Sequence, residues 1–350
     1  MLPLFERYPI LQETLAFRPL VDRPTAVERL DLGDWLGCDS VWHKRDDRAN
    51  ALYGGNKVRR YEFVLAEALR RKAEHIVTVG GLASTQVMAT ALFAKEAGLP
   101  VTAVMFDQPY TSFMREALLV DAGAGATLIR GYGYAGTAVR ALAVQLRTKR
   151  PYFIPPGASD PLSNIGYIDA MFELDAQVRN GEASRPDVMV LPAGSSGTLA
   201  ALAIGCALLG WKTRVVGVRI SRALVTNRFT IHIVARRTWR FLTRAVPELA
   251  GQPMPHLNYV LYGGAAGEGY GCPTREAIEA LPMVQQAIGA RGEVTYSAKA
   301  LVGLRAVAQR GQNVLLWETL SSARPDVSGL RPREVLPKSF WPLFDGEVEV

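Results

Sequence analysis

The sequence is poor in the residues that build metal sites and disulfide frameworks. Among its 350 residues there are three cysteines and four histidines. No two of the cysteines form a C-x-x-C pair, and three scattered cysteines do not make a disulfide framework. We therefore expect a protein of a reducing compartment that holds no metal ion.

The chain also lacks a long apolar run. The longest extends from Thr198 to Gly210, which is shorter than the roughly 20 residues that cross a bilayer. This run predicts a buried helix. The first residues of the chain carry charges where a secretion signal has its apolar core. We expect a soluble, cytoplasmic protein with no membrane partner.

What is present is the composition of a globular protein with a sizeable core. Hydrophobic residues make up 49% of the chain and charged residues 21%. The length suggests about two domains. The net charge of +7 permits an anionic partner but does not require one.

Short apolar segments alternate with segments of helical periodicity through most of the chain. We expect strands at residues 75–80, 101–106, 187–192, 213–220 and 313–317. We expect helices at residues 58–72, 84–97, 197–210 and 298–310. This alternation is typical of an α/β protein with mainly parallel sheets. The proline-rich residues 152–161 are expected to form a loop, and the segment from residue 321 onward to wrap over the surface.

The segment YGGNKVRR, residues 53–60, places Lys57 at the start of a helix. Two glycines before it let the backbone approach a bound group closely. The partial positive charge of a helix N-terminus lowers the pKa of an ammonium group, and a neutral amine can attack an aldehyde. Taken alone, the segment also fits a solvated lysine beside Arg59 and Arg60.

Two further segments lie where a strand gives way to a helix. GGLASTQ, residues 80–86, follows a strand at the end where open α/β sheets bind ligands, although Ser84 is also a plausible helix N-cap. AGSSGT, residues 193–198, has the small residues of an anion cradle at a helix start and would suit a phosphate. It contains neither G-x-G-x-x-G nor a Walker A motif, and a plain turn is the alternative.

Tyrosines stand among small residues in two later segments. GGAAGEGYGCPT, residues 263–274, contains Tyr270, and EVTYSAK, residues 293–299, contains Tyr296. Each tyrosine alone is more readily explained as a buried structural residue than as a catalytic one.

In their order along the chain, these segments resemble the pyridoxal-phosphate-dependent enzymes of fold type II. The resemblance is strongest to the branch that contains 1-aminocyclopropane-1-carboxylate deaminase and D-cysteine desulfhydrase. It covers roughly residues 20 to 320. The motifs that carry it are VWHKRDD (41–47), GGNKVRRYEF (54–63), GGLASTQ (80–86), IPPGASDPLSNIGY (154–167), AGSSGT (193–198), GYGCPT (269–274), TYSAKAL (295–301) and VLLW (314–317).

The resemblance implies a fold and an assembly. The fold is α/β, with two open, mainly parallel sheets that carry helices on both faces and with the cofactor in the cleft between domains. The large domain, which binds pyridoxal 5'-phosphate, would comprise residues 1–59 and 166–350. The small inserted α/β domain would comprise residues 60–165. We expect a homodimer from family analogy alone.

The resemblance also implies the site residues. Lys57 matches the lysine that holds the cofactor covalently and moves the substrate's α-proton. The implied catalytic set is Lys57, Ser84, Tyr270 and Tyr296. The implied cofactor-binding set is Lys57, Asn56, Thr85, Gly194, Ser195, Ser196, Gly197, Thr198 and Ser297. The implied substrate-binding set is Ser84, Gln86 and Glu318, and no metal is implied.

Two positions depart clearly from the family pattern, and a third change, Ala298-Lys299 in place of Gly-Lys after the tyrosine motif, is mild. Thr85 stands where the family has an asparagine that bonds the cofactor's ring hydroxyl, and threonine offers no amide. Glu318 stands in place of a histidine or related residue and adds a carboxylate near the substrate end. Both departures suggest an altered choice of substrate or reduced activity.

The residue after the second tyrosine helps to choose the reaction. The ring-opening deaminases have Tyr-Glu here and the desulfhydrases Tyr-Thr, whereas this chain has Tyr296-Ser297. We therefore expect a lyase or deaminase that removes the α-proton and eliminates the β-substituent of a small, cysteine-like amino acid, giving a keto acid and ammonia. Ring opening of 1-aminocyclopropane-1-carboxylate, β-replacement and racemisation are alternatives on the same scaffold. A catalytically retired binding or scaffold protein is the alternative of another class.

The segment from Lys212 to Arg244 is rich in arginine, with Trp239 and Phe241 among the basic residues. Such a pattern can bind nucleic acid. No nucleic-acid-binding motif accompanies it, so we expect a surface helix whose arginines are solvated or paired at a subunit contact, and no nucleic-acid partner.

Overall fold

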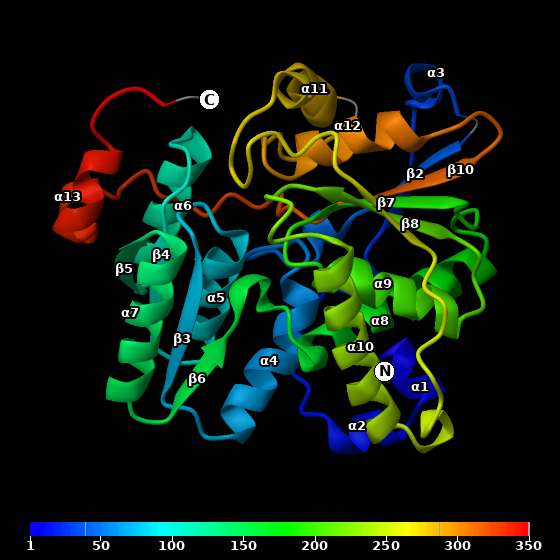
Figure 1. Cartoon of the computed structure of the whole chain (residues 1–350), viewed down its shortest axis with the longest axis horizontal. Coiled ribbons are helices and arrows are strands. Elements are labelled where there is room, and N and C mark those ends of the chain that lie inside the picture. The colour runs from blue at the N-terminus through cyan, green and yellow to red at the C-terminus, as the bar shows by residue number, and fades with distance from the viewer. Residues whose placement is uncertain (39, 287, 349–350) are drawn as a thin grey trace. The chain divides into compact units, whose positions relative to one another are not determined.

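The computed structural model describes residues 1–38, 40–286 and 288–348 (Figure 1). It divides into two compact units. The first unit comprises Met1–Phe63 and Ser159–Ser322, and the second comprises Val64–Ala158 and Ala323–Val350. The C-terminal segment thus belongs to the second unit, whereas the sequence-based division placed it in the large domain. The division into a cofactor-binding domain and an inserted domain stays a prediction.

The first unit is built on a six-stranded sheet in the order β1-β2-β10-β7-β8-β9. β1 is antiparallel to β2, and the other neighbours are parallel. The strands are β1 (Val27–Leu30), β2 (Ser40–Lys44), β7 (Val188–Ala193), β8 (Arg214–Arg219), β9 (Tyr259–Tyr262) and β10 (Asn313–Trp317). All six residues of β7 are buried, as expected of a strand that is covered on both faces.

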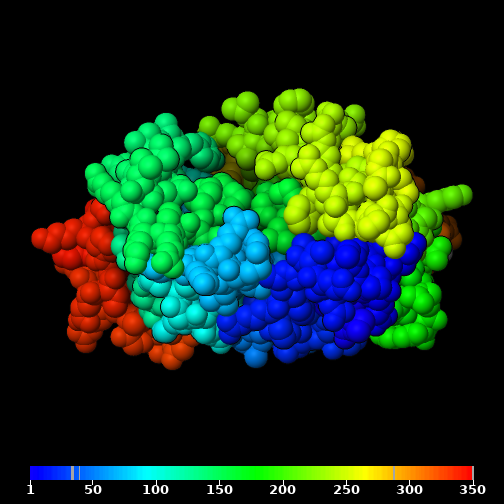
Figure 2. Space-filling model, turned by 90° about the horizontal axis from the view of Figure 1, so that it is seen from below, coloured from blue at the N-terminus to red at the C-terminus, as the bar shows by residue number. Residues whose placement is uncertain are grey.

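Helices cover both faces of this sheet. The helices α8, α9 and α10 pack over one face and α11 and α12 over the other. The helices of the unit are α1 (Pro3–Arg7), α2 (Ile10–Thr14), α3 (Gly33–Leu36), α8 (Pro161–Arg179), α9 (Gly197–Leu208), α10 (Arg228–Ala245), α11 (Arg275–Gln286), α12 (Ser297–Val307) and the short 3₁₀ helices η1 (Asp46–Arg48) and η3 (Pro247–Leu249). Figure 2 shows the N-terminal segment (blue) beside the segment that follows α10 (yellow).

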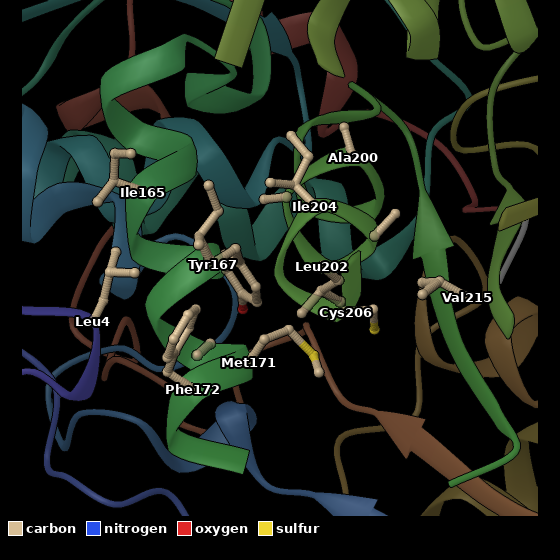
Figure 3. Packing of buried hydrophobic residues seen from close by; sticks show 14 of the residues in the cluster. Leu4, Ile165, Tyr167, Met171, Phe172, Ala200, Leu202, Ile204, Cys206 and Val215 are labelled. Atoms are coloured by element: carbon tan, nitrogen blue, oxygen red, sulfur yellow. The ribbon is translucent and has the colours of Figure 1, made fainter. Parts of the chain in front are cut away.

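The core of the first unit lies around α8 and α9. Tyr167 and Met171 of α8 pack with Leu202, Ile204 and Cys206 of α9 (Figure 3). The apolar run in α9 is buried from its start, which confirms the predicted buried helix. α8 begins with a capping box followed by a proline, an arrangement that favours helix initiation at that point.

The second unit holds a four-stranded, fully parallel sheet in the order β5-β4-β3-β6. Its strands are β3 (His75–Gly81), β4 (Val101–Phe106), β5 (Thr127–Tyr132) and β6 (Pro151–Ile154). Its helices are α5 (Thr85–Glu96), α6 (Ser112–Gly123), α7 (Tyr134–Arg147), α13 (Pro332–Val335) and the 3₁₀ helices η2 (Pro156–Ala158) and η4 (Lys338–Leu343). Helix α4 (Val58–Arg70) begins in the first unit and ends in the second.

The predicted class of fold, α/β with two mainly parallel sheets, is confirmed. The strands predicted at 101–106 and 313–317 agree with β4 and β10 to the residue. Two local expectations are wrong. The proline-rich stretch from residue 152 begins as strand β6 rather than as a loop. The C-terminal segment does not only cover the surface, because Phe340 and Leu343 of η4 are buried.

Candidate functional site

Lys57 stands at the end of a tight loop directly before α4. A Cβ at Gly54 would lie 2.0 Å from the Asp47 carbonyl oxygen, and Gly55 has a positive φ of 82°, so both positions need glycine. The Gly55 N–H donates to the Asp46 carbonyl at 2.7 Å, and the Asn56 N–H donates to the Thr319 carbonyl at 2.9 Å. The loop is therefore held between η1 and the segment that follows β10.

The Lys57 side chain is buried, with 8% of its surface exposed. Its Nζ makes no hydrogen bond or ion pair with another described residue. Burial lowers the pKa of the ammonium group well below its ordinary value, and the Arg60 guanidinium lowers it further. The expected lowering of the pKa thus has burial as its main cause. An amine that is readily neutral at this position can act as a nucleophile or as a base.

The loop between β7 and α9 offers a set of unpaired donors. Ser196 adopts a left-handed conformation, with φ of 67°, immediately before α9 begins. The backbone N–H groups of residues 194–198 have no acceptor among the described residues, and the buried Ser196 Oγ has no hydrogen-bond partner there. Free N–H groups at the start of a 12-residue helix form an anion site. The loop therefore fits a phosphate group.

Thr198 joins this loop to the loop of Lys57. Its Oγ1 accepts hydrogen bonds from Asn56 Nδ2 at 3.2 Å and from Arg60 Nη2 at 2.9 Å. Arg60 also donates to Asn164 Oδ1 at 2.7 Å and is fully buried. A buried positive charge thus stands behind the unpaired donors. Sequence reasoning assigned Arg60 no role, because only the packing of α4 shows that it is buried.

Gly197 has no room for a side chain. A Cβ there would lie 2.0 Å from Ser159 Oγ and 2.8 Å from both Arg60 Nη2 and Asn164 Oδ1. On the role that the family resemblance implies for this loop, we expect Gly197→Ala to displace it and to weaken cofactor binding at least about tenfold. The measurement is an absorbance titration of the cofactor-free protein with pyridoxal phosphate. The matched control is Gly133→Ala, where nothing lies within 4 Å of the added Cβ, and unchanged binding by Gly197→Ala would contradict the role of this loop.

Tyr270 and Tyr296 meet in the structure although they are 26 residues apart in the sequence. Their hydroxyl groups are hydrogen-bonded to each other, and their rings pack edge to face with centroids 6.0 Å apart. Burial raises the pKa of Tyr270 well above its ordinary value, and Tyr296 raises it further. Tyr270 therefore keeps its proton near neutral pH.

Two residues outside the predicted site set position this pair. Lys299 of α12 is buried, and its Nζ donates to the carbonyls of Ala266 and Cys272 at 3.0 and 2.8 Å. These bonds fasten the segment that carries Tyr270 to the helix that follows Tyr296. The Glu293 carboxylate accepts the N–H of Tyr296 at 2.9 Å. The only sequence signal for a supporting role of Lys299 was its position three residues after Tyr296.

Ser297 and Glu318 are both buried and bonded within their own turns. The Ser297 hydroxyl donates to the Arg291 carbonyl at 2.9 Å and accepts the Glu293 N–H at 3.1 Å. Glu318 Oε1 accepts two backbone N–H groups that directly follow it. Burial, with help from Asp47, raises the pKa of Glu318 to about 8, so its carboxyl is mostly protonated at neutral pH. Their roles toward cofactor and substrate stay predictions.

Ser84, Thr85 and Gln86 belong to the second unit, and the structure does not define their distance from Lys57. Ser84 is the N-cap of α5, as its sequence context suggested, and its Oγ accepts the Val87 N–H at 3.4 Å. The buried Gln86 amide donates to Thr78 Oγ1 at 2.7 Å. Their catalytic, cofactor-binding and substrate-binding roles also stay predictions.

The described residues include neither a cluster of metal ligands nor a membrane-spanning helix. No group of three Cys, His, Asp or Glu side chains lies close enough together there to hold a metal ion. No described helix is long and apolar enough to cross a membrane.

The chain is similar to known proteins over most of its length. The model of a family described as pyridoxal-phosphate dependent enzymes matches residues 19–317. A D-cysteine desulfhydrase of Serratia proteamaculans is 31% identical over 306 residues, which cover 84% of this chain and 89% of the relative. A candidate 1-aminocyclopropane-1-carboxylate deaminase of Pyrococcus furiosus is 30% identical over 318 residues, which cover 87% and 92%.

Solved structures show the same fold. A homologue of 1-aminocyclopropane-1-carboxylate deaminase superposes with a TM-score of 0.77 at 25% identity and covers 94% of this chain and 98% of that structure. An L-serine ammonia-lyase of Rhizomucor miehei superposes with a TM-score of 0.59 at 17% identity, covering 85% and 93%, and supports the fold alone.

Proposed function

We propose that this chain, which belongs to the family of pyridoxal-phosphate-dependent enzymes, is a lyase or deaminase that eliminates the β-substituent of a small, cysteine-like amino acid. The observation that carries the proposal is the buried Lys57. Asn56 and Thr198 join it to a loop whose unpaired hydrogen-bond donors can bind a phosphate. Similarity to the D-cysteine desulfhydrase of Serratia proteamaculans supports this class of substrate.

Different residues of the site would hold different parts of the cofactor. The N–H groups of residues 194–198 and the Ser196 hydroxyl would bind the phosphate, with the Arg60 charge behind them. Lys57 would attach the aldehyde carbon. When bound, pyridoxal phosphate supplies a conjugated ring that withdraws electrons from the α-carbon of the substrate. Thr85 and Ser297 are the proposed contacts to the ring, and Ser84, Gln86 and Glu318 the proposed contacts to the substrate.

Proton transfer falls to Lys57 and the tyrosine pair. A neutral Lys57 amine accepts the α-proton of the substrate, and burial together with Arg60 lowers its pKa and so favours this neutral form. The bond between Cβ and the leaving group then breaks, and the leaving sulfur takes a proton from the hydroxyl pair of Tyr270 and Tyr296. Water converts the remainder of the substrate to a keto acid and ammonia.

Ring opening of 1-aminocyclopropane-1-carboxylate is the second candidate. Similarity to the Pyrococcus furiosus relative and to the solved deaminase homologue favours it. The hydroxyl at Ser297 favours elimination instead, because no carboxylate stands at that position to keep the ring nitrogen protonated. A homodimer is part of the proposal.

A panel of substrates separates the two candidates. We expect the purified holoenzyme to release sulfide and pyruvate from D- or L-cysteine, measured by colorimetric sulfide detection and by coupled reduction of pyruvate. Formation of 2-oxobutanoate from 1-aminocyclopropane-1-carboxylate without sulfide from cysteine would favour ring opening. Absence of product from every substrate, with the cofactor bound, would favour a binding or scaffold protein.

A further inference from the structure

A long stretch of the first unit carries positive charge only. From Val188 to Pro247 the sequence contains no aspartate or glutamate, but it contains one lysine and eight arginines. Five of the arginines lie in α10, and none of these five makes an ion pair with a described residue. Unpaired like charges produce a strongly positive local potential. The catalytic proposal above makes no use of it.

The outward face of α10 collects these charges. Exposed residues recur at helical spacing along the helix, while Ile231, Ala235, Trp239 and Leu242 of the opposite face are buried in the core. The exposed residues are Arg228, Phe229, His232, Ile233, Arg236, Arg237, Arg240 and Arg244.

Large apolar side chains are also exposed at the N-terminal end of this face. Leu224, just before the helix, is 89% exposed, and Phe229 in its first turn is 72% exposed. Val225 and Ile233 are 44% and 38% exposed. We call these four residues, with the exposed arginines of α10, the α10 surface; the yellow-green atoms of this region lie at the surface in Figure 2. The sequence showed the arginines but not this exposure.

We propose that the α10 surface docks on an anionic phospholipid membrane. The arginines would contact the phosphate groups of the lipids, and Leu224 and Phe229 would insert into the boundary between headgroups and acyl chains. A basic helix that adds exposed apolar side chains has the two features that bind a protein to a negatively charged bilayer surface. This contact lies on the surface of the lipid and needs no spanning helix.

The charge and hydrophobicity of the α10 surface favour a membrane over two other binding partners, a second copy of the chain and a nucleic acid. A second copy of the chain, docked by the same surface on both subunits, would place arginines against arginines with no acidic residue of α10 to pair them. A nucleic acid would satisfy the arginines, but its polar backbone offers no apolar environment to the aliphatic Leu224 and Val225. An anionic lipid surface satisfies both kinds of side chain.

The experiment is co-sedimentation of the full-length holoenzyme with vesicles. One set of vesicles is phosphatidylcholine alone, and the other contains phosphatidylglycerol in addition. We expect binding only to the vesicles with phosphatidylglycerol, weakening as salt is raised. Arg236→Gln and Arg240→Gln should each weaken binding about fivefold. The double variant Leu224→Asn, Phe229→Asn should weaken it at least about tenfold.

A matched control tests whether apolar side chains elsewhere behave alike. Leu142 and Leu146 of α7 are 56% and 78% exposed but lie in the second unit. The double variant Leu142→Asn, Leu146→Asn should bind vesicles as the unchanged protein does. Circular dichroism confirms that each variant is folded, and turnover, where the protein shows it, should be the same for all of them because none of these residues belongs to the site.

Four results would overturn the proposal. The first is absence of binding to phosphatidylglycerol vesicles at low salt. The second is a Leu224→Asn, Phe229→Asn variant that binds vesicles unchanged, and the third is tighter binding of a duplex oligonucleotide than of vesicles; either would indicate charge attraction alone. The fourth is conversion of an oligomer to a monomer by that variant without any vesicle binding, which would assign the surface to a second copy.

Discussion

Replacement of Lys57 by alanine is expected to lower turnover at least about 1000-fold. The Lys57 side chain is buried beside Arg60, and its Nζ makes no hydrogen bond or ion pair with another described residue. The variant should also fail to retain pyridoxal phosphate through borohydride reduction and unfolding. The measurements are steady-state turnover with the best substrate of the panel and mass spectrometry of the peptide that contains residue 57.

Two variants separate the chemistry of Lys57 from its charge. Lys57→Arg keeps a positive charge but does not provide a neutral amine, because arginine stays protonated. It should be as inactive as the alanine variant. Lys212→Ala removes an exposed lysine from the same unit and should keep full turnover. Substantial turnover by Lys57→Ala, with the cofactor held as firmly as before, would refute the assignment of this residue.

Arg59→Met is expected to lower the free energy of unfolding by about 3–5 kcal/mol. Arg59 is fully buried, and its Nη2 donates to Asp46 Oδ1 at 2.9 Å and to Glu173 Oε1 at 2.7 Å. Lys44 Nζ donates to the same Glu173 oxygen at 2.7 Å. Removal of the guanidinium leaves the buried Asp46 carboxylate without its ion pair, while Glu173 keeps Lys44 and the more distant Arg23. Urea denaturation followed by circular dichroism measures the change.

A surface ion pair provides the control for this cluster. Arg275→Met removes the exposed bond to Glu279, and we expect it to leave the free energy of unfolding nearly unchanged. An equal loss of stability in both variants would contradict the argument from burial. The cluster fixes η1 against the first turn of α4, so it also sets the position of the loop that ends at Lys57.

The same cluster gives stability a dependence on pH. Burial alone would raise the pKa of Asp46 and of Glu173, but Arg59 and Lys44 outweigh it and lower both below their ordinary values. The unfolded chain therefore binds more protons than the folded chain in acid. This part of the stability is complete above the ordinary pKa of a carboxyl group and is lost as the pH falls below it. The Arg59→Met variant should lose less stability on acidification than the unchanged protein.

The sequence by itself determined the class of fold and the candidate site. Strands such as β4 and β10 are continuous apolar runs bounded by polar residues, and such local patterns do not depend on distant parts of the chain. The glycines before Lys57 and the small residues at 194–198 likewise predict, from local sequence alone, a close approach of the backbone to a ligand. Their order along the chain resembled one family, and the family match is confirmed.

Elements with a mixed or uniform pattern escaped sequence reasoning. β1 and β9 are short and only partly buried, so their residues show no regular alternation. α8 is buried on nearly every side and lacks the single apolar stripe by which a helix is usually found. In both cases the neighbouring elements decide the burial, and they are distant in the sequence.

Only the tertiary structure decided which polar residues support the site. Arg60, Lys299 and Glu293 look like ordinary surface residues in the sequence, yet all three are buried and bonded to segments far along the chain or to the turn that holds Tyr296. The exposure of Leu224 and Phe229 is likewise decided by tertiary packing, because no other described segment covers them. Burial and pairing are properties of packed elements, because a side chain loses water only where another segment covers it.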